Sequence, residues 1–323
     1  MISQGIFTFF VIILSIKLTK KISLVDLPNK RKVHTGNIPL AGGISLFFSL
    51  IYMLKFGNFD DFYLNSIIGY SLLISLVGII DDKYNLNVGS KLALMTFAIF
   101  FLIKEGLVVN SLGSYDFLGE LNLGTMQVMF TFIAVLLLIN GFNYIDGIDG
   151  ICIALFINGL IFLYFLNFNN ENFNNFLQHL ILISTILLLF NISILKLPKI
   201  FLGDGGSLML GFIASFLLIY SFKILNIHPA KLIWCFNLII FDFLAVNINR
   251  FIKNKKIFTA GNDHLHHILL KKFKSSSKTV FIMLVINSLF GYSGIFISDI
   301  NNLFSIFLFI VSFLFYFILR RIY

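Results

Sequence analysis

Short acidic and amide side chains gather where several apolar stretches of the chain end. Asp81 and Asp82 close one such stretch, in the segment IIDDKYNL. Two adjacent carboxylates at the boundary of an apolar helix repel each other unless a cation or a bound proton compensates their charge. We therefore expect a divalent metal or a proton beside this pair. The alternative is a simple stop signal at the end of a helix.

A second polar segment joins two apolar stretches and reads NGFNYIDGIDG. Its oxygen-bearing side chains recur every three residues, at Asn140, Asn143, Asp146 and Asp149. A continued helical turn would bring residues at this spacing near one face. Carboxylate and amide oxygens are the ligands of hard cations such as Mg²⁺. The sequence therefore indicates a magnesium site, with a polar turn capped by Asn and Asp as the alternative.

A third segment, FLGDGGS, opens another apolar stretch. Ser207 could cap the new helix, and the helix N-terminus beside Gly205 could receive phosphate oxygens on its backbone N–H groups. Asp204 in the same turn is reasonable only with a cation between its carboxylate and the phosphate. The turn matches neither a Walker loop nor a dinucleotide-binding fingerprint.

A fourth segment, DHLHHILLKK, lies in a basic loop. Asp263 is a plausible N-cap for a short amphipathic helix, and His264, His266 and His267 follow it. We favour histidines that donate hydrogen bonds to phosphate. Zn²⁺ is an alternative, although neither Cys nor Glu supplies the remaining ligands. A solvated amphipathic loop is the other.

The first basic loop carries Lys30, Arg31, Lys32 and His34. A basic cluster beside a membrane attracts anionic lipid head groups as a matter of course. Its position on the same side as the other polar segments favours a role in substrate binding.

The elements that must position these residues are membrane helices. The chain has 323 residues, of which 58% are hydrophobic and only 12% charged, which excludes a soluble globule, a disordered chain and a disulfide scaffold. We expect an all-α polytopic bundle that forms one membrane domain over 1–323, with no separate soluble domain. About eleven helices are predicted, over 2–19, 40–55, 64–80, 89–103, 125–140, 149–166, 176–196, 206–224, 231–248, 278–297 and 301–319.

The basic residues predict the orientation of these helices. If the loop after the first helix is cytosolic, that side and the C-terminus together hold 20 of the 24 Lys and Arg residues. The positive-inside rule then places the N-terminus outside and the C-terminus inside, with an uncleaved first helix. The net charge of +9 therefore reflects membrane orientation and does not indicate nucleic acid. The two cysteines, Cys152 and Cys235, lie in apolar stretches and are interpreted as packing residues.

Taken together, the motifs resemble a family. DLPNKRKVH with PLAGG, the DD pair, NxxNxxDGxDG, FxGDxGS and DHxHH occur in this order in the polyprenyl-phosphate N-acetylhexosamine-1-phosphate transferases. The resemblance covers about residues 22 to 272. It is greatest to the bacterial enzymes that move GlcNAc-1-phosphate from UDP-GlcNAc to undecaprenyl phosphate.

The resemblance implies a reaction and a site. A lipid phosphate oxygen attacks the β-phosphate of the UDP-sugar and UMP leaves, in the bacterial inner membrane, with the active site on the cytosolic face. The resemblance thus implies that this reaction is the first membrane step in the synthesis of a surface polysaccharide. By resemblance Asn143 and Asp204 are the leading ligands of Mg²⁺, which Mn²⁺ could replace. Further contacts to the substrates are implied for Asp146, Asp149, Lys91, Asp242, Arg250 and the three histidines.

Some alternatives stay open. Asp81 and Asp82 could form a covalent phosphosugar intermediate, but we favour a role in orienting the lipid phosphate, because an ionised phosphate is already a nucleophile. The donor could also be UDP-GalNAc, a UDP-6-deoxy-HexNAc or UDP-MurNAc-pentapeptide. A polytopic transporter is the competing class, but its acidic residues should lie near the middle of the membrane. The sequence is compatible with a homodimer.

Overall fold

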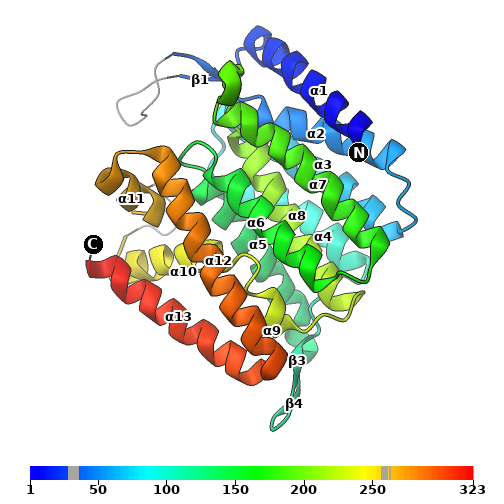
Figure 1. The fold of residues 1–323 in the computed structure, drawn as a ribbon, viewed down its shortest axis with the longest axis vertical. Helices are drawn as coiled ribbons and strands as arrows, with labels where there is room; N and C mark the ends of the chain where they lie inside the picture. The colour runs from blue at the N-terminus through cyan, green and yellow to red at the C-terminus, as the bar shows by residue number, and fades with distance from the viewer. Residues whose placement is uncertain (28–35, 256–260, 262, 323) are drawn as a thin grey trace. The chain divides into compact units, whose positions relative to one another are not determined.

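The computed structural model describes residues 1–27, 36–255, 261 and 263–322, and most of them are helical (Figure 1). The predicted basic site at Lys30, Arg31, Lys32 and His34 lies outside the described residues. The chain forms two compact units. Unit 1 comprises Met1–Phe101 and Asn170–Ile213, and unit 2 comprises Leu102–Asn169 and Ala214–Tyr323. The expectation of one membrane domain stays a prediction.

Unit 1 is built from apolar helices and one short pair of antiparallel strands. Helix α1 packs against α2 and α7, and α2 also packs against α3. In β1 and β2, which are antiparallel, Val25 pairs with Pro39 and Asp26 with Ile38. Its elements are α1 (Ile2–Lys21), β1 (Val25–Asp26), β2 (Ile38–Pro39), α2 (Gly42–Phe56), α3 (Phe62–Tyr84), most of α4 (Val88–Lys104), α7 (Glu171–Asn191), η2 (Ile194–Lys196) and the start of α8 (Gly203–Lys223).

Local polar residues set the ends of these helices. The Asp61 carboxylate accepts a hydrogen bond from the Leu64 N–H at 2.9 Å and so begins α3. Asn85 ends the same helix with a left-handed backbone at φ 51°. The side chain of Asn170 accepts from the Phe173 N–H at 2.9 Å and begins α7. Each cap satisfies a backbone group that an apolar helix would otherwise leave unpaired.

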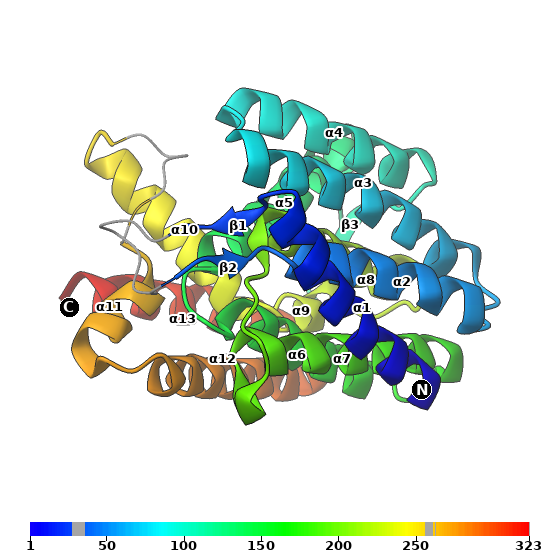
Figure 2. The ribbon, with the colours of Figure 1, turned by 90° about the horizontal axis from the view of Figure 1, so that it is seen from above.

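Unit 2 contains a second pair of antiparallel strands and the C-terminal helices. The long helices α12 and α13 lie side by side in both views (Figures 1 and 2), and α12 also packs against α6, α10 and α11. The elements are β3 (Ser111–Tyr115), β4 (Gly119–Asn122), η1 (Gly124–Met126), α5 (Gln127–Ile145), α6 (Ile151–Leu166), the rest of α8, α9 (Pro229–Leu232), α10 (Asn237–Ile252), α11 (Leu265–Phe273), α12 (Ser276–Ile300) and α13 (Asn302–Ile322).

The ninth predicted helix, 231–248, is not continuous. The structure divides it into the short α9 and α10, which begins at Asn237. At the break the Asn287 side chain accepts from the Leu238 N–H at 3.1 Å, and Asn237 donates to the Asn287 carbonyl oxygen at 3.0 Å. The Asn287 carboxamide of α12 therefore pairs the Leu238 N–H at the break, and such side-chain partners are how interrupted helices are tolerated in apolar surroundings.

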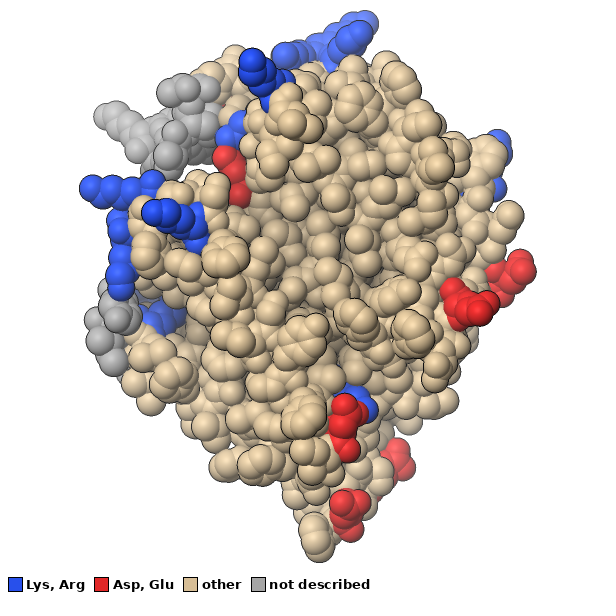
Figure 3. Space-filling model, in the orientation of Figure 1, with Lys and Arg blue, Asp and Glu red and all other residues tan. Residues whose placement is uncertain are grey.

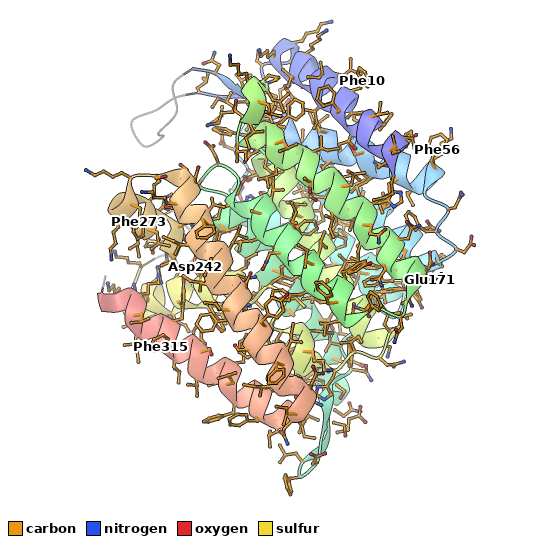
Figure 4. The ribbon with its side chains drawn as sticks, in the orientation of Figure 1. Phe10, Phe56, Glu171, Asp242, Phe273 and Phe315 are labelled. Carbon is orange, nitrogen blue, oxygen red and sulfur yellow. The ribbon has the colours of Figure 1, made fainter. Side chains whose placement is uncertain are left out.

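The described part of the chain has seven helices long and apolar enough to cross a membrane: α1, α3, the segment Gly124–Ile145, α7, α8, α12 and α13. A helix overlaps each of the eleven predicted spans. Only 22% and 17% of the apolar windows of α12 and α13 are buried, and large exposed side chains such as Phe10, Phe56 and Phe315 (Figure 4) indicate contact with lipid. In Figure 3 most of the face shown carries no charge. The protein is thus an all-α polytopic membrane protein, whose number of spans and orientation stay predictions.

Candidate active site

Three of the predicted site residues form an ion-paired group in unit 1. The Lys91 ammonium, on α4, lies 2.7 Å from Asp81 Oδ2 and 2.5 Å from Asp204 Oδ2. A lysine ammonium of the chain itself therefore compensates the charge of Asp81 in this structure, and the expected divalent metal stays a prediction. We call Asp81, Asp82, Lys91 and Asp204 the acidic cluster.

Asp82 plays a different part from its neighbour. Its two carboxylate oxygens accept the backbone N–H groups of Asp204 at 2.9 Å and of Gly205 at 3.2 Å. A carboxylate on α3 therefore caps the N-terminus of α8, where a negative charge is favourable. The prediction that Ser207 caps this helix is wrong, because α8 begins at Gly203 and Ser207 is fully buried within it.

Glycines allow the backbone at the start of α8 to approach its neighbours closely. A Cβ added at Gly78 of α3 would lie 2.4 Å from the Asp204 carbonyl oxygen, and one at Gly43 of α2 would lie 2.6 Å from the Gly206 nitrogen. Gly43 also donates its N–H to the Leu202 carbonyl oxygen at 3.0 Å. The PLAGG motif thus holds the FLGDGGS segment in place, a role that the sequence did not reveal.

The donor atoms of the acidic cluster fit a hard divalent cation. Carboxylate oxygens are the ligands Mg²⁺ prefers, and the ammonium between Asp81 and Asp204 marks where positive charge is stabilised. Over the described ranges, no group of three or more His, Cys, Asp or Glu side chains is arranged to hold a metal ion. A bound ion would therefore need the Lys91 ammonium to move away from Asp204 and would take further ligands of another type.

The histidines form a separate group in unit 2, which we call the histidine cluster: Asp242, His264, His266 and His267. Asp242 of α10 (Figure 4) is 2% exposed, and its Oδ2 lies 2.7 Å from His264 Nδ1. Its Oδ1 accepts the Leu265 N–H at 3.0 Å. One buried carboxylate therefore orients the first histidine ring and fixes the start of α11.

Asp263 was expected to cap this short helix, and that prediction is wrong. The N-cap position is occupied by His264, and Asp263 instead accepts two hydrogen bonds from Arg250, at 2.9 Å from Nε and 2.6 Å from Nη2. Burial raises the pKa of Asp263, but the Arg250 guanidinium outweighs it and holds that pKa below its usual value. The pair fastens the loop before α11 to the end of α10.

His266 is the least usual member of the histidine cluster. Its side chain is fully buried, and neither ring nitrogen has a hydrogen-bond partner among the described residues. Burial, together with the neighbouring His267, lowers the pKa of His266 to about 3. An unpaired buried polar ring is costly and invites a functional explanation. Gly147 leaves room for it, because a Cβ there would lie 2.5 Å from His266 Nε2.

This burial predicts an acid-sensitive segment. Because the pKa of His266 is lowered to about 3 in the folded protein and is near 6.5 when unfolded, stability falls as pH drops through that window. At pH 5 the loss is about 2 kcal/mol. We expect amide exchange in α11, corrected for intrinsic rates, to accelerate between pH 7 and pH 5, and His266→Phe to remove most of that acceleration. Equal acceleration in the variant would contradict the prediction.

The segment between α5 and α6 is only partly helical. Asn140 and Asn143 lie in α5, but the helix ends at Ile145, so Asp146 occupies the C-cap and Asp149 a turn. The expected continuous helical row is therefore wrong beyond Asn143. Asn140 donates its side-chain N–H to the Leu136 carbonyl oxygen at 2.8 Å. The side chains of Asn143, Asp146 and Asp149 are half-buried.

The structure adds two residues that the sequence analysis missed. Tyr316 and Arg320, on α13, lie next to Asp242, with the tyrosine hydroxyl 2.8 Å and Arg320 Nε 4.0 Å from Asp242 Oδ1. A polar pair four residues apart on the last apolar helix was the available signal, because such residues share a helix face.

Comparison with known proteins gives a consistent result. The model of the family described as glycosyl transferase family 4 matches residues 64–222. An undecaprenyl-phosphate alpha-N-acetylglucosaminyl 1-phosphate transferase of Yersinia pestis is 29% identical, over 93% of this chain and 85% of its own. The enzyme of the same name from Salmonella typhi is 31% identical, over 90% and 81%. A probable undecaprenyl-phosphate N-acetylglucosaminyl 1-phosphate transferase of Bacillus subtilis is 29% identical, over 90% and 83%.

Proposed function

The chain belongs to glycosyl transferase family 4, and from that membership we propose that it transfers GlcNAc-1-phosphate from UDP-GlcNAc to undecaprenyl phosphate and releases UMP. The observation that carries this proposal is the similarity of relatives with that activity in their names over 90% or more of the chain. We place the enzyme in the bacterial inner membrane with both clusters on the cytosolic side, because 20 of the 24 basic residues are predicted there.

Charge is the chief obstacle in such a reaction, since a lipid phosphate must approach a diphosphate. Catalysis then depends on groups that stabilise negative charge on phosphoryl oxygens. Bound Mg²⁺, or Mn²⁺ in its place, would neutralise the diphosphate, and we propose Asp204 and Asn143 as its ligands. Lys91 and the histidine cluster supply further positive or hydrogen-bonding groups. The unpaired nitrogens of His266 support this role.

The remaining predicted residues take supporting parts in this proposal. Asp146 and Asp149 would position the uridine and the diphosphate. Arg250 is engaged by Asp263, and Asp242 is engaged by His264 and by the Leu265 N–H. We therefore propose that both residues position their neighbours and do not contact the substrate directly. Lys30, Arg31, Lys32 and His34 stay a proposed steering cluster for anionic substrates, and a homodimer stays compatible with the chain.

Asp81 and Asp82 are better suited to orienting the lipid phosphate than to attacking the UDP-sugar and forming a covalent intermediate. All four carboxylate oxygens of Asp81 and Asp82 are engaged: those of Asp81 by the Leu86 N–H at 2.7 Å and by Lys91, and those of Asp82 by the start of α8. A carboxylate held by several donors is a weaker nucleophile than a free one. We therefore propose one direct displacement by the lipid phosphate.

Direct displacement predicts that the protein does not react with UDP-GlcNAc when the lipid phosphate is absent. We expect protein incubated with labelled UDP-GlcNAc and Mg²⁺, but no polyprenyl phosphate, to acquire no stable label. Labelled UMP should likewise not exchange into UDP-GlcNAc. Label on the protein, or lipid-independent exchange, would instead establish a covalent intermediate.

The position of Lys91 leads to a second prediction, which concerns metal binding first and turnover second. Because its ammonium lies at 2.5 Å from Asp204, it competes with any cation for that carboxylate. We expect Lys91→Met to bind Mn²⁺ about tenfold more tightly than the unaltered protein, in titrations followed by electron paramagnetic resonance. Its turnover should fall, because a phosphate contact is lost.

The exposed Lys83, on α3, offers a matched control. Lys83→Met removes the same charge near the same face of the unit and should leave Mn²⁺ affinity within about twofold of the original. Unchanged or weaker Mn²⁺ binding by Lys91→Met would remove Lys91 from competition with the metal.

The donor sugar is tested by a panel. Purified protein in lipid nanodiscs is given undecaprenyl phosphate with UDP-GlcNAc, UDP-GalNAc, a UDP-6-deoxy-HexNAc or UDP-MurNAc-pentapeptide, and the lipid product is identified by mass spectrometry. We expect UDP-GlcNAc to give the highest kcat/KM. A higher value for any other donor would overturn the assignment of GlcNAc while leaving the reaction class intact.

A further inference from the structure

The C-terminal helix α13 contributes a buried polar face to the histidine cluster. The Tyr316 hydroxyl donates a hydrogen bond to Asp242 Oδ1 at 2.8 Å, and both side chains are buried. Arg320, four residues further along, has its Nε 4.0 Å from the same oxygen, with only 7% of the side chain exposed. Residues four apart lie one above the other on a helix, so Tyr316 and Arg320 approach the Asp242 carboxylate from the same face of α13.

The Asp242 carboxylate in turn determines the positions of the three histidines of the histidine cluster. Asp242 Oδ2 lies 2.7 Å from His264 Nδ1, and Oδ1 accepts the Leu265 N–H at 3.0 Å. A ring that donates its Nδ1–H to a carboxylate keeps Nε2 available for another partner. The Leu265 contact also fixes the first turn of α11, which carries His266 and His267. The orientation of all three rings thus depends on how Asp242 is held.

Without the contacts from α13, Asp242 would be a buried carboxylate with fewer donors. A buried charge persists only when it is paired and hydrogen-bonded. Tyr316 directs Oδ1 through a hydrogen bond, whereas Arg320 contributes charge at a distance too long for one. The two residues therefore act on Asp242 by different means, and they can be tested separately.

We infer that Tyr316 and Arg320 are positioning residues: they orient Asp242 so that His264, held through its Nδ1–H, directs its Nε2 at an anionic substrate and donates an Nε2–H to a phosphate oxygen when the ring carries a proton on each nitrogen. The last part of this inference rests on the proposed function, because that function supplies the phosphate. The first part concerns the chain alone. Both residues act on substrate only through Asp242 and His264, so their effect should appear in turnover and in the state of the His264 ring.

Tyr316→Phe removes only the hydroxyl and is the first test. In nanodiscs with UDP-GlcNAc and undecaprenyl phosphate we expect kcat to fall about tenfold while both KM values change less than about twofold. Nitrogen NMR of ¹⁵N-histidine-labelled protein should show His264 as the Nδ1–H form originally and as a mixture of both forms in the variant. Tyr292→Phe, an exposed position on α12, is the control and should alter neither quantity.

Arg320 is tested by a pair of substitutions. Because Arg320 acts by charge, Arg320→Lys should keep turnover within about threefold of the original, whereas Arg320→Met should lose about tenfold. An unchanged kcat and an unchanged His264 ring in Tyr316→Phe would overturn the inference. A fall in kcat that accompanies a lower thermal midpoint, with the ring unchanged, would also overturn it, since that is a purely structural role. The NMR result needs no turnover, so it stands or fails independently of the proposed transferase activity.

Discussion

Asp204→Asn is expected to lose about 10³-fold in turnover, because the carboxylate that would hold the divalent cation is replaced by a neutral amide of nearly the same shape. The backbone N–H of residue 204, which donates to Asp82 at 2.9 Å, is retained. The variant should therefore insert into the membrane and fold normally. Turnover is measured as UMP release at saturating UDP-GlcNAc over a range of Mg²⁺ concentrations.

The control for this substitution is Asp299→Asn. Asp299 is exposed and pairs with Lys231 in unit 2, so the same chemical change there should cost less than about twofold. Near-normal turnover of Asp204→Asn at ordinary Mg²⁺ concentrations would remove Asp204 from the metal site.

Gly78→Ala is expected to lose about 10²-fold in turnover. Its Cβ would lie 2.4 Å from the backbone of Asp204 and from the Gly205 nitrogen, whereas nonbonded heavy atoms normally stay about 3.5 Å apart. Helix α3 and the start of α8 must then separate by about 1 Å, a displacement that costs about 10²-fold when it falls on catalytic groups. The Asp82 cap of α8 should be lost with it.

Gly69 of the same helix provides a matched control, because nothing lies within 4 Å of a Cβ added there. Gly69→Ala should keep full turnover and, as an exposed helical position, gain about 0.5–1 kcal/mol of stability. Equal turnover of the two variants would show that the close approach at Gly78 has no bearing on the site.

The helical fold was accessible from the sequence because lipid requires long apolar segments with internally satisfied backbones. Each predicted span overlaps a helix for this reason. The break before Asn237 was not accessible, because it depends on the Asn287 carboxamide, about fifty residues further along the chain. A pattern of apolar residues indicates how long a membrane segment can be. It does not indicate where a distant side chain pairs with a backbone group of that segment and so allows the helix to break.

The candidate site was predicted as a set of residue types and not as a set of contacts. Asp81, Lys91 and Asp204 were all singled out, yet the ion pairs that join them came only from the structure. Asp263 looked like a helix cap because of its position before the histidines, but Arg250 outcompetes that role with two charged hydrogen bonds. Tyr316 alone is an ordinary tyrosine in an apolar helix, and only its spacing of four residues from Arg320 indicated a shared polar face.

The nucleotide product tests the central claim most directly. Purified protein in nanodiscs receives UDP-GlcNAc and undecaprenyl phosphate, with Mg²⁺ or with excess chelator, and the released nucleotide is identified by chromatography. Transfer of a phosphosugar predicts one UMP for each lipid-linked product, with release abolished by the chelator. Release of UDP would instead mean transfer of the sugar alone, and release of neither nucleotide with any HexNAc donor would contradict the transferase assignment itself.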